Sequence, residues 1–212
     1  MKFSVSDKIG SVSYEILSPT KPKAILVLAH GAGAGMNHPF MKSLSEELLA
    51  YSIATLRFNF PFIELKKKRP DFPGVAHATI QAAIQWAAEQ FRGTPLFAGG
   101  KSFGGRMTSQ LMATKEIEEV KGLLFFGFPL HQPGNRGVER AEHLKNVKVP
   151  MLFLQGTRDA LSDFQLIQQV VNGLPKTTLV SFEGADHSFK AGKQNLIPQL
   201  GKCSADWIEE HG

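Results

Sequence analysis

The chain has 212 residues, 42% hydrophobic and 20% charged, which excludes an intrinsically disordered protein and a coiled coil. Its single cysteine excludes an internal disulfide framework and a zinc site made of thiolates. The formal net charge of +5 raises the question of an acidic partner, but residues 61–70 contribute +3 and residues 71–212 are neutral. Because the excess lies mostly in one short segment, we expect no nucleic acid partner.

Residues 1–17 alternate polar and apolar side chains, which predicts an opening strand or hairpin. They hold no apolar run of the kind that a signal peptide needs. No apolar run in the whole chain reaches the roughly 18–20 residues of a membrane span. We therefore expect a soluble cytoplasmic protein without a membrane partner.

Short apolar runs follow along the rest of the chain, and most of them are apolar at every position. Continuous runs of this length are typical of parallel strands that are covered on both faces. The predicted strands are 24–29, 52–58, 95–98, 120–126, 149–154 and 177–182.

Segments with helical spacing of apolar side chains separate these strands. The predicted helices lie around 80–91, 103–115, 162–172 and 196–207. Two irregular stretches, 59–74 and 129–149, are predicted to be long loops over one edge of the sheet. The alternation predicts one α/β domain over residues 1–212, with a mostly parallel sheet and helices on both faces.

The strongest chemical signal is the G-x-S-x-G motif at residues 100–104, which follows a predicted strand and precedes a predicted helix. A turn from strand to helix at one residue forces the serine into a strained backbone conformation. The glycines on either side of it leave space for the backbone of a neighbouring segment. The hydroxyl then stands at a helix N-terminus, where N–H groups stabilise negative charge. The motif predicts Ser102 as a nucleophile.

Two nucleotide-binding motifs are alternatives in the same glycine-rich segments. A phosphate-binding loop, G-x-x-x-x-G-K-[ST], needs glycine where the chain has Pro95. A dinucleotide-binding loop, G-x-G-x-x-G/A, needs glycine or alanine where Met36 or His38 stands. We therefore expect no nucleotide cofactor.

The H-G-A-G-A-G segment at residues 30–35 better fits a turn of exposed N–H groups that faces the serine. In hydrolases with this motif, one oxyanion-hole donor is the N–H after the nucleophile. The other donor comes from a loop after an earlier strand. These positions predict Phe103 and Ala32 as the oxyanion donors.

An acid and a base must follow the serine in the order Ser, Asp, His. Asp159 and His187 each follow a predicted strand in that order, and of the seven histidines only His187 has a suitable place. We expect Ser102 to attack a carbonyl, His187 to move its proton and Asp159 to orient the imidazole.

Other polar residues near these positions have simpler interpretations. The competing acid Asp163 lies about one turn into the next helix, where a helix-dipole role suffices. Asp186 adjoins His187, and a neighbouring side chain rarely reaches the imidazole from the correct side. The basic run 66–69 is expected to be a solvated loop rather than a binding site for an acidic partner. The sequence assigns no role to three residues near the predicted site: Lys101, Arg106 and His131.

Nearly the whole chain resembles the α/β-hydrolase superfamily, through the segments L-A-H-G-A-G-A-G, R-F-N-F-P, G-G-K-S-F-G-G-R, F-P-L-H, Q-G-T-R-D and G-A-D-H-S-F. It is most similar to the compact, lidless branch related to dienelactone hydrolases, in a subgroup that includes bacterial hydrolase-like proteins and a subunit of a chromatin acetyltransferase complex. The resemblance implies serine-dependent hydrolysis and an eight-stranded fold, of which this chain could be short of the first strand. Because Ser102 stands where that branch often has cysteine, dienelactone is not the expected substrate.

We therefore expect a serine hydrolase that cleaves an ester, thioester or similar acyl bond of a small molecule, without a metal or organic cofactor. Only 32 residues separate Phe126 from Asp159, too few for a strand and a cap domain, so the pocket should be open. The alternative is a non-catalytic interaction domain with the same fold. Its mark would be a broken triad, whereas all three members are present here.

Overall fold

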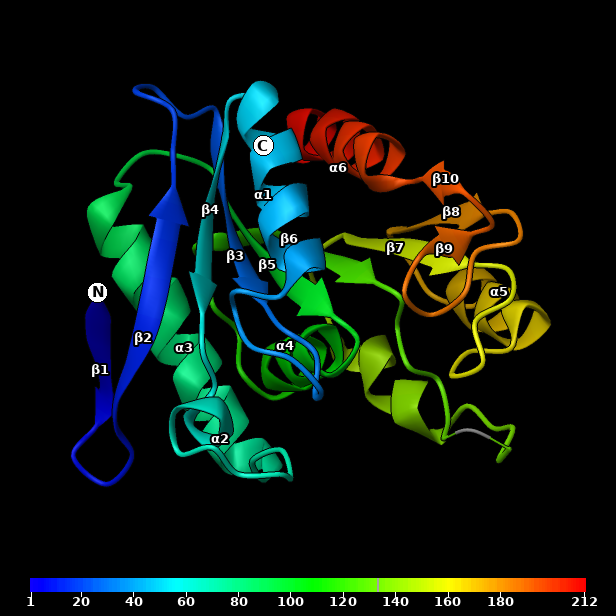
Figure 1. Ribbon diagram of the computed structural model, residues 1–212, viewed down its shortest axis with the longest axis horizontal. Coiled ribbons are helices and arrows are strands. Elements are labelled where there is room, and N and C mark those ends of the chain that lie inside the picture. Colours follow the sequence, from blue (N-terminus) through cyan, green and yellow to red (C-terminus); the bar gives the residue numbers. More distant parts are fainter. Residues whose placement is uncertain (133) are drawn as a thin grey trace.

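An eight-stranded sheet runs through the computed structural model, which describes residues 1–132 and 134–212 (Figure 1). The strands are β1 (Lys2–Ser6), β2 (Gly10–Leu17), β3 (Ala24–Ala29), β4 (Ile53–Phe58), β5 (Leu96–Lys101), β6 (Val120–Phe126), β7 (Met151–Gly156) and β8 (Thr177–Phe182). Their order across the sheet is β1-β2-β4-β3-β5-β6-β7-β8. The strands from β4 to β8 pair in parallel, whereas β1–β2 and β2–β4 are antiparallel pairs.

Helices cover both faces of this sheet (Figure 1). One face carries α1 (Pro39–Ala50) and α6 (Ile197–His211), and the other carries α3 (Pro73–Gln90), α4 (Phe103–Thr114) and α5 (Phe164–Asn172). The connections hold a one-turn helix, α2 (Pro61–Glu64), a 3₁₀ helix, η1 (Glu139–Asn146), and a short hairpin of β9 (Lys190–Ala191) and β10 (Gln194–Asn195). None of the helices in the described ranges combines the length and hydropathy needed to cross a bilayer.

The buried strand β3 shows how the core is divided. Ile25 and Val27 pack with α3, α4 and α5, while Leu26 and Leu28 pack with α1 and α6. All four side chains are at most 1% exposed. A strand that is buried on both faces has to be apolar at every position, and this is why the continuous apolar run predicted β3.

The predicted fold class is confirmed, and no cap domain interrupts the described residues between β6 and β7, where η1 is the only helix. The suggestion that the chain could be short of its first strand was wrong. Phe3 of β1 lies opposite Val12 of β2, and both are at most 5% exposed, so the N-terminal hairpin belongs to the core. The predicted strand 95–98 was too short at its C-terminal end, since β5 continues through two glycines to Lys101.

The two predicted long loops were wrong in part, because they contain regular structure. The stretch 59–74 holds α2 and the start of α3, and the stretch 129–149 holds η1. Helix α1 was also not predicted, although its buried residues Met41, Leu44 and Leu48 have helical spacing and Pro39 begins it.

Candidate active site

Ser102 stands between the last residue of β5 and the first residue of α4. Its backbone has φ 51° and ψ −113°, a conformation that costs a non-glycine residue about 1–3 kcal/mol. The flanking glycines are needed for space. A Cβ at Gly100 would lie 2.2 Å from the carbonyl oxygen of Ala29, and one at Gly104 would lie 2.5 Å from the same atom. The G-x-S-x-G motif therefore lets β5 and α4 pass close to the end of β3.

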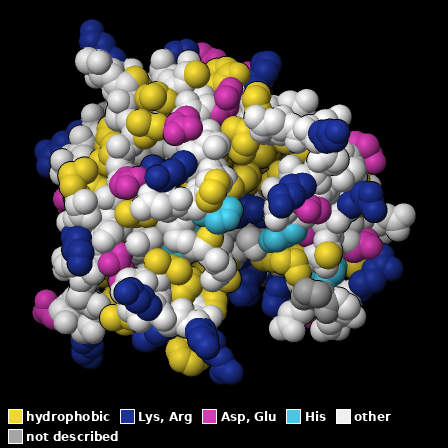
Figure 2. Space-filling view, viewed as in Figure 1, with side chains coloured by type: hydrophobic (Ala, Val, Ile, Leu, Met, Phe, Trp, Pro, Cys, Tyr) yellow, Lys and Arg dark blue, Asp and Glu magenta, His cyan; other side chains and the backbone are white. Residues whose placement is uncertain are grey.

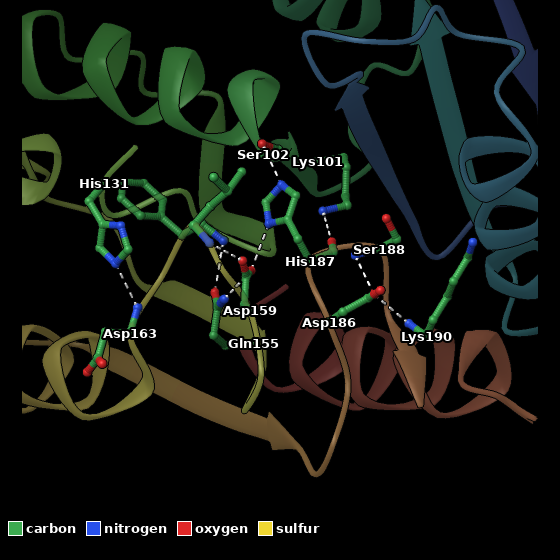
Figure 3. A network of polar contacts seen from close by, with 12 residues as sticks. Lys101, Ser102, His131, Gln155, Asp159, Asp163, Asp186, His187, Ser188 and Lys190 are labelled. Carbon is green, nitrogen blue, oxygen red and sulfur yellow. Dashed lines mark hydrogen bonds and ion pairs between the residues drawn. The ribbon is translucent and has the colours of Figure 1, made fainter. Parts of the chain in front are cut away.

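The structure brings together the three residues predicted to act in order, from the ends of three strands (Figure 3). Ser102 Oγ lies 2.9 Å from His187 Nε2, and His187 Nδ1 lies 2.7 Å from Asp159 Oδ2. Because a carboxylate only accepts, the imidazole donates from Nδ1 and accepts the serine hydroxyl at Nε2. The serine, histidine and aspartate thus form one continuous chain of hydrogen bonds.

Asp159 is held by groups that sequence reasoning missed. Its side chain is fully buried, and its Oδ2 also accepts from Gln155 Nε2 at 2.7 Å. Its Oδ1 accepts from the N–H of Leu161 at 2.8 Å, while Gln155 Oε1 accepts from the N–H of Phe128. The end of β7 and the loop after it therefore hold both carboxylate oxygens of Asp159 in place.

The two predicted oxyanion donors come from two different elements next to Ser102. Phe103 is the first residue of α4, so its N–H has no partner within the helix. Ala32 lies in the loop after β3 and lines the same cavity as Ser102. Both residues thus lie on elements next to Ser102, and their role as oxyanion donors stays a prediction.

His30 anchors the loop that carries Ala32. It is fully buried, its Nε2 accepts from the N–H of Phe60 at 3.0 Å, and its Nδ1 lies 2.8 Å from the carbonyl oxygen of Gly31. The ring packs edge-on against Phe60 and Phe62. Burial lowers the pKa of His30 to about 4, so the ring is neutral and donates from Nδ1.

The R-F-N-F-P segment holds the far end of the same loop. Arg57 donates to the carbonyl oxygen of Met36 at 2.7 Å and forms an ion pair with Glu15 at 2.8 Å. Asn59 Oδ1 accepts from the N–H of Met36 at 2.9 Å. The loop after β3 is therefore held at both ends by buried or half-buried polar groups.

A cavity of about 360 Å³ opens at the serine. Its lining is mostly small or apolar, and includes the loop 31–34, Phe40, Met41 and Leu161 together with Lys101, Ser102 and His187. The space-filling view shows histidine side chains near a hollow in the middle of this face, while Lys and Arg are scattered over the face and mixed with acidic side chains (Figure 2). The cavity is open to solvent, and nothing in its lining is acidic.

The competing residues are engaged elsewhere. Asp186 accepts from the N–H groups of Ser188 and Lys190 within its own turn (Figure 3). Asp163 caps the N-terminus of α5 rather than lying inside it, and pairs with Arg136. His131 is buried, and its Nε2 accepts from the N–H of Asp163 at 3.0 Å, so it ties two loops together outside the cavity.

Two further sequence interpretations concern charge and metals. The basic run 66–69 is exposed at all four positions, on the segment that follows α2. Among residues 1–132 and 134–212, no group of three or more His, Cys, Asp or Glu side chains has the arrangement of a metal site.

A family model described as an alpha/beta hydrolase domain matches residues 22–204. Among curated proteins, the chain is 27% identical over 207 residues to a protein of Mycobacterium tuberculosis strain H37Rv that is provisionally named a phosphoribosyl transferase. That match covers 94% of this chain but only 44% of the relative, so the chain spans less than half of its length.

Solved structures of similar fold are found over nearly the full length of the chain. An alpha-beta serine hydrolase homologue from Coxiella burnetii has a TM-score of 0.78 at 20% identity, and the match covers 97% of this chain and 96% of that one. A dienelactone hydrolase from Anabaena variabilis also has a TM-score of 0.78, at 19% identity, covering 100% of this chain and 98% of that one. At these identities the likeness shows the fold alone.

Proposed function

Because the chain belongs to the alpha/beta hydrolase family, we propose that it is a serine hydrolase that cleaves an ester, thioester or similar acyl bond. The observation that carries the proposal is the hydrogen-bonded chain from Ser102 through His187 to Asp159, with distances of 2.9 and 2.7 Å. This arrangement is the one in which a weak serine nucleophile is activated by an adjacent base.

In the proposed reaction, Ser102 Oγ attacks the carbonyl carbon of the substrate while His187 Nε2 accepts the hydroxyl proton. Asp159 holds the imidazole in the correct tautomer and stabilises its positive charge. His187 then gives the proton to the leaving group, and an acyl-enzyme forms on Ser102. Water attacks this ester while His187 accepts a proton from it. The bond between the acyl carbon and Ser102 Oγ then breaks, His187 returns the proton to Oγ, and the acid product leaves.

The N–H groups of Ala32 and Phe103 are the proposed donors to the negatively charged oxygen of the tetrahedral intermediate. They come from two elements whose positions are set by buried contacts, so little reorganisation is needed when the charge develops. The bonds of His30 to Phe60 and Gly31 support the position of Ala32. Replacement of one such donor costs about 10²- to 10³-fold in kcat in a comparable site.

The mostly apolar cavity of about 360 Å³ favours a small acyl group. The transferase name of the mycobacterial relative belongs to a protein of which this chain matches 44%, and it is not carried over. The cytoplasmic location, a single domain over residues 1–212 and the absence of nucleic acid or membrane partners stay predictions.

Labelling with a fluorophosphonate probe tests the proposal. The intact mass of the protein should increase by one phosphonyl adduct, and Ser102→Ala should abolish the adduct. Ser181→Ala is the matched control, because Ser181 is an exposed serine on β8 and should leave labelling unchanged. Equal labelling of the wild type and Ser102→Ala would exclude Ser102 as the nucleophile. Turnover of 4-nitrophenyl esters of increasing chain length would then define the acyl group.

The alternative is a non-catalytic interaction domain, which the intact hydrogen-bonded chain disfavours. It would gain support if the folded protein neither takes up the probe nor hydrolyses an activated ester such as 4-nitrophenyl acetate.

A further inference from the structure

Lys101 is the last residue of β5 and directly precedes Ser102, yet the proposed reaction gives its side chain no task. Its Nζ donates a hydrogen bond to the carbonyl oxygen of His187 at 2.5 Å (Figure 3). The two residues are 86 positions apart. The lysine therefore links the strand that carries the nucleophile to the loop that carries the base.

This link is the only hydrogen bond that the backbone of His187 makes within the described residues. The other hydrogen bonds of residues 186–189 either stay inside the segment 186–190 or involve the imidazole. Lys190 at the end of this segment pairs with Asn195 in the β9–β10 hairpin.

Without Lys101, no hydrogen bond within the described part of the chain would hold the His187 backbone directly. Its position would depend on the turn of residues 186–190 and on the packing of Phe189 against Phe40 and Phe182. These contacts would then have to set the distance from the imidazole to Ser102.

Two aromatic rings and a glycine surround the ammonium group of Lys101. Nζ lies 5.9 Å from the ring centre of Phe40 and 5.4 Å from that of Phe189, and the two rings are nearly parallel with centres 5.8 Å apart. A Cβ at Gly127 would lie 2.9 Å from Nζ, so the glycine there leaves room for the lysine. Aromatic faces attract a cation most strongly where water is excluded.

Burial of this charge acts against the stability of the fold. Desolvation lowers the pKa of Lys101 from 10.5 to about 8, and the charges of Asp159 and Asp186 oppose that shift only in part. A methionine of similar length would avoid the desolvation. A half-buried lysine with a desolvated charge thus acts against the stability of the fold, at a place where chemistry is proposed.

We propose that Lys101 is a positioning residue, whose bond to the His187 carbonyl keeps the imidazole within reach of Ser102. The inference rests on the proposed function, because it assigns the lysine to the base of that reaction. It differs from a role in binding an anionic substrate, which would be seen in KM for charged substrates. Positioning of the base is seen in kcat for a neutral substrate.

The kinetic test compares Lys101→Met and Lys101→Arg with the wild type, using neutral 4-nitrophenyl acetate. We expect Lys101→Met to lower kcat by about 10- to 100-fold, because a small displacement of a reacting group has effects of that size. KM should stay unchanged and Tm should rise. Lys101→Arg keeps a charged donor and should recover part of kcat.

Lys121→Met is the matched control, because Lys121 is an exposed lysine on the neighbouring strand β6 and should leave kcat and KM unchanged. Wild-type kcat in Lys101→Met would overturn the proposal. An effect confined to KM, or an equal loss of kcat in the methionine and arginine variants, would also overturn it.

A second measurement does not depend on turnover. The Nδ1 proton that His187 shares with Asp159 should give a downfield proton resonance, which Asp159→Asn should abolish. We expect the resonance to be lost or broadened in Lys101→Met and kept in Lys121→Met. An unchanged resonance in Lys101→Met would overturn the positioning role even if kcat falls. If the wild type hydrolyses no ester at all, the proposed function fails, whereas this resonance still tests Lys101.

The pH dependence of the wild type, compared with that of Lys101→Met, supplies a third readout. The groups that face Nζ are Asp159, Asp186 and the carbonyl of His187. Above about pH 8 the folded protein loses the Lys101 proton, while the unfolded chain keeps it up to 10.5. The unfolded state then binds more protons, so this group raises the free energy of unfolding as pH rises through that window.

Over the same window kcat should fall, because a neutral amine donates a weaker hydrogen bond than an ammonium group. Activity and stability should therefore change in opposite directions in the wild type. Lys101→Met should show neither change relative to its own value at pH 7. Parallel pH profiles of kcat in the wild type and in Lys101→Met would contradict the proposal.

Discussion

His30 and His187 both follow a strand of the central sheet, at its carboxyl edge, and both have two bonded ring nitrogens. The partners of His30 are backbone groups of Phe60 and Gly31. The partners of His187 are the side chains of Ser102 and Asp159. A histidine bonded to backbone can only hold the chain, whereas one placed between a hydroxyl and a carboxylate can move a proton.

Exposure separates the two histidines in the same way. His30 is fully buried and its pKa is lowered to about 4, so it stays neutral near neutral pH. The side chain of His187 is 23% exposed and lines the cavity, where a substrate can reach it. The comparison predicts that changes at His187 mainly lower activity, whereas changes at His30 mainly lower stability.

The largest expected effect is that of His187→Ala on activity. Removal of the base should lower kcat for 4-nitrophenyl acetate by about 10⁴- to 10⁶-fold, as in other serine hydrolases of this arrangement. Urea unfolding should change little, because the side chain is 23% exposed. Retention of more than a tenth of wild-type kcat would show that His187 is not the base.

The next effect is that of Asp159→Asn. An amide at this position cannot accept two N–H donors in the same way and favours the wrong imidazole tautomer, which costs about 10⁴-fold in kcat in a comparable site. The measurement is kcat at neutral pH, with circular dichroism to confirm folding. Gln155 donates to the same oxygen, so Gln155→Ala should lower kcat by a smaller factor.

A third test addresses the stability side of the comparison. His30→Ala should lower the free energy of unfolding by about 3–5 kcal/mol, because it leaves a cavity beside Phe60 and an unbonded N–H. Urea titration measures the loss. Ser102 should still react with the fluorophosphonate probe in the folded fraction, but more slowly, because the bonds of His30 support the position of Ala32. Labelling of folded His30→Ala at the wild-type rate would show that His30 does not hold the loop that carries Ala32.

The smallest effect is the pH dependence that His30 contributes. Its pKa falls from 6.5 in the unfolded chain to about 4 in the folded protein, so the unfolded state binds more protons between those values. Its contribution is complete above pH 6.5 and is lost as pH falls toward 4, by about 3 kcal/mol in total. The stability difference between the wild type and His30→Ala should shrink over that window. A difference that stays constant from pH 7 to pH 4 would contradict it.

Much of the fold was predictable because the signals are local. β3 and β6 are apolar at nearly every position, and the G-x-S-x-G turn needs only the residues next to it. The predicted C-terminal end of β5 was wrong, because it depends on contacts with residues that are distant in the sequence. β5 extends to Lys101 because Gly99 and Gly100 let it pass β6 and β3, where a Cβ at Gly99 would lie 1.9 Å from the carbonyl oxygen of Leu124.

The candidate site divides in the same manner. The order of Ser102, Asp159 and His187 along the chain follows from the order of strand ends, so the sequence alone indicated these three residues. Sequence reasoning missed the supporting groups Gln155 and His30, because glutamine and histidine at such places have many equally good interpretations. Only their partners, Asp159 and Phe60, show what they do.

By itself, the sequence determined the sheet class and indicated the strained turn at Ser102 and the three residues that meet there. The sheet class and the turn follow from the spacing of neighbouring residues, and the three residues follow from the order of strand ends along the chain. The tertiary structure alone decided that Lys101 reaches His187 across 86 positions and that His30 does not reach the cavity. Contacts of that kind depend on the strand order across the sheet and on which loops fold over its edge, and no local pattern of residues records either.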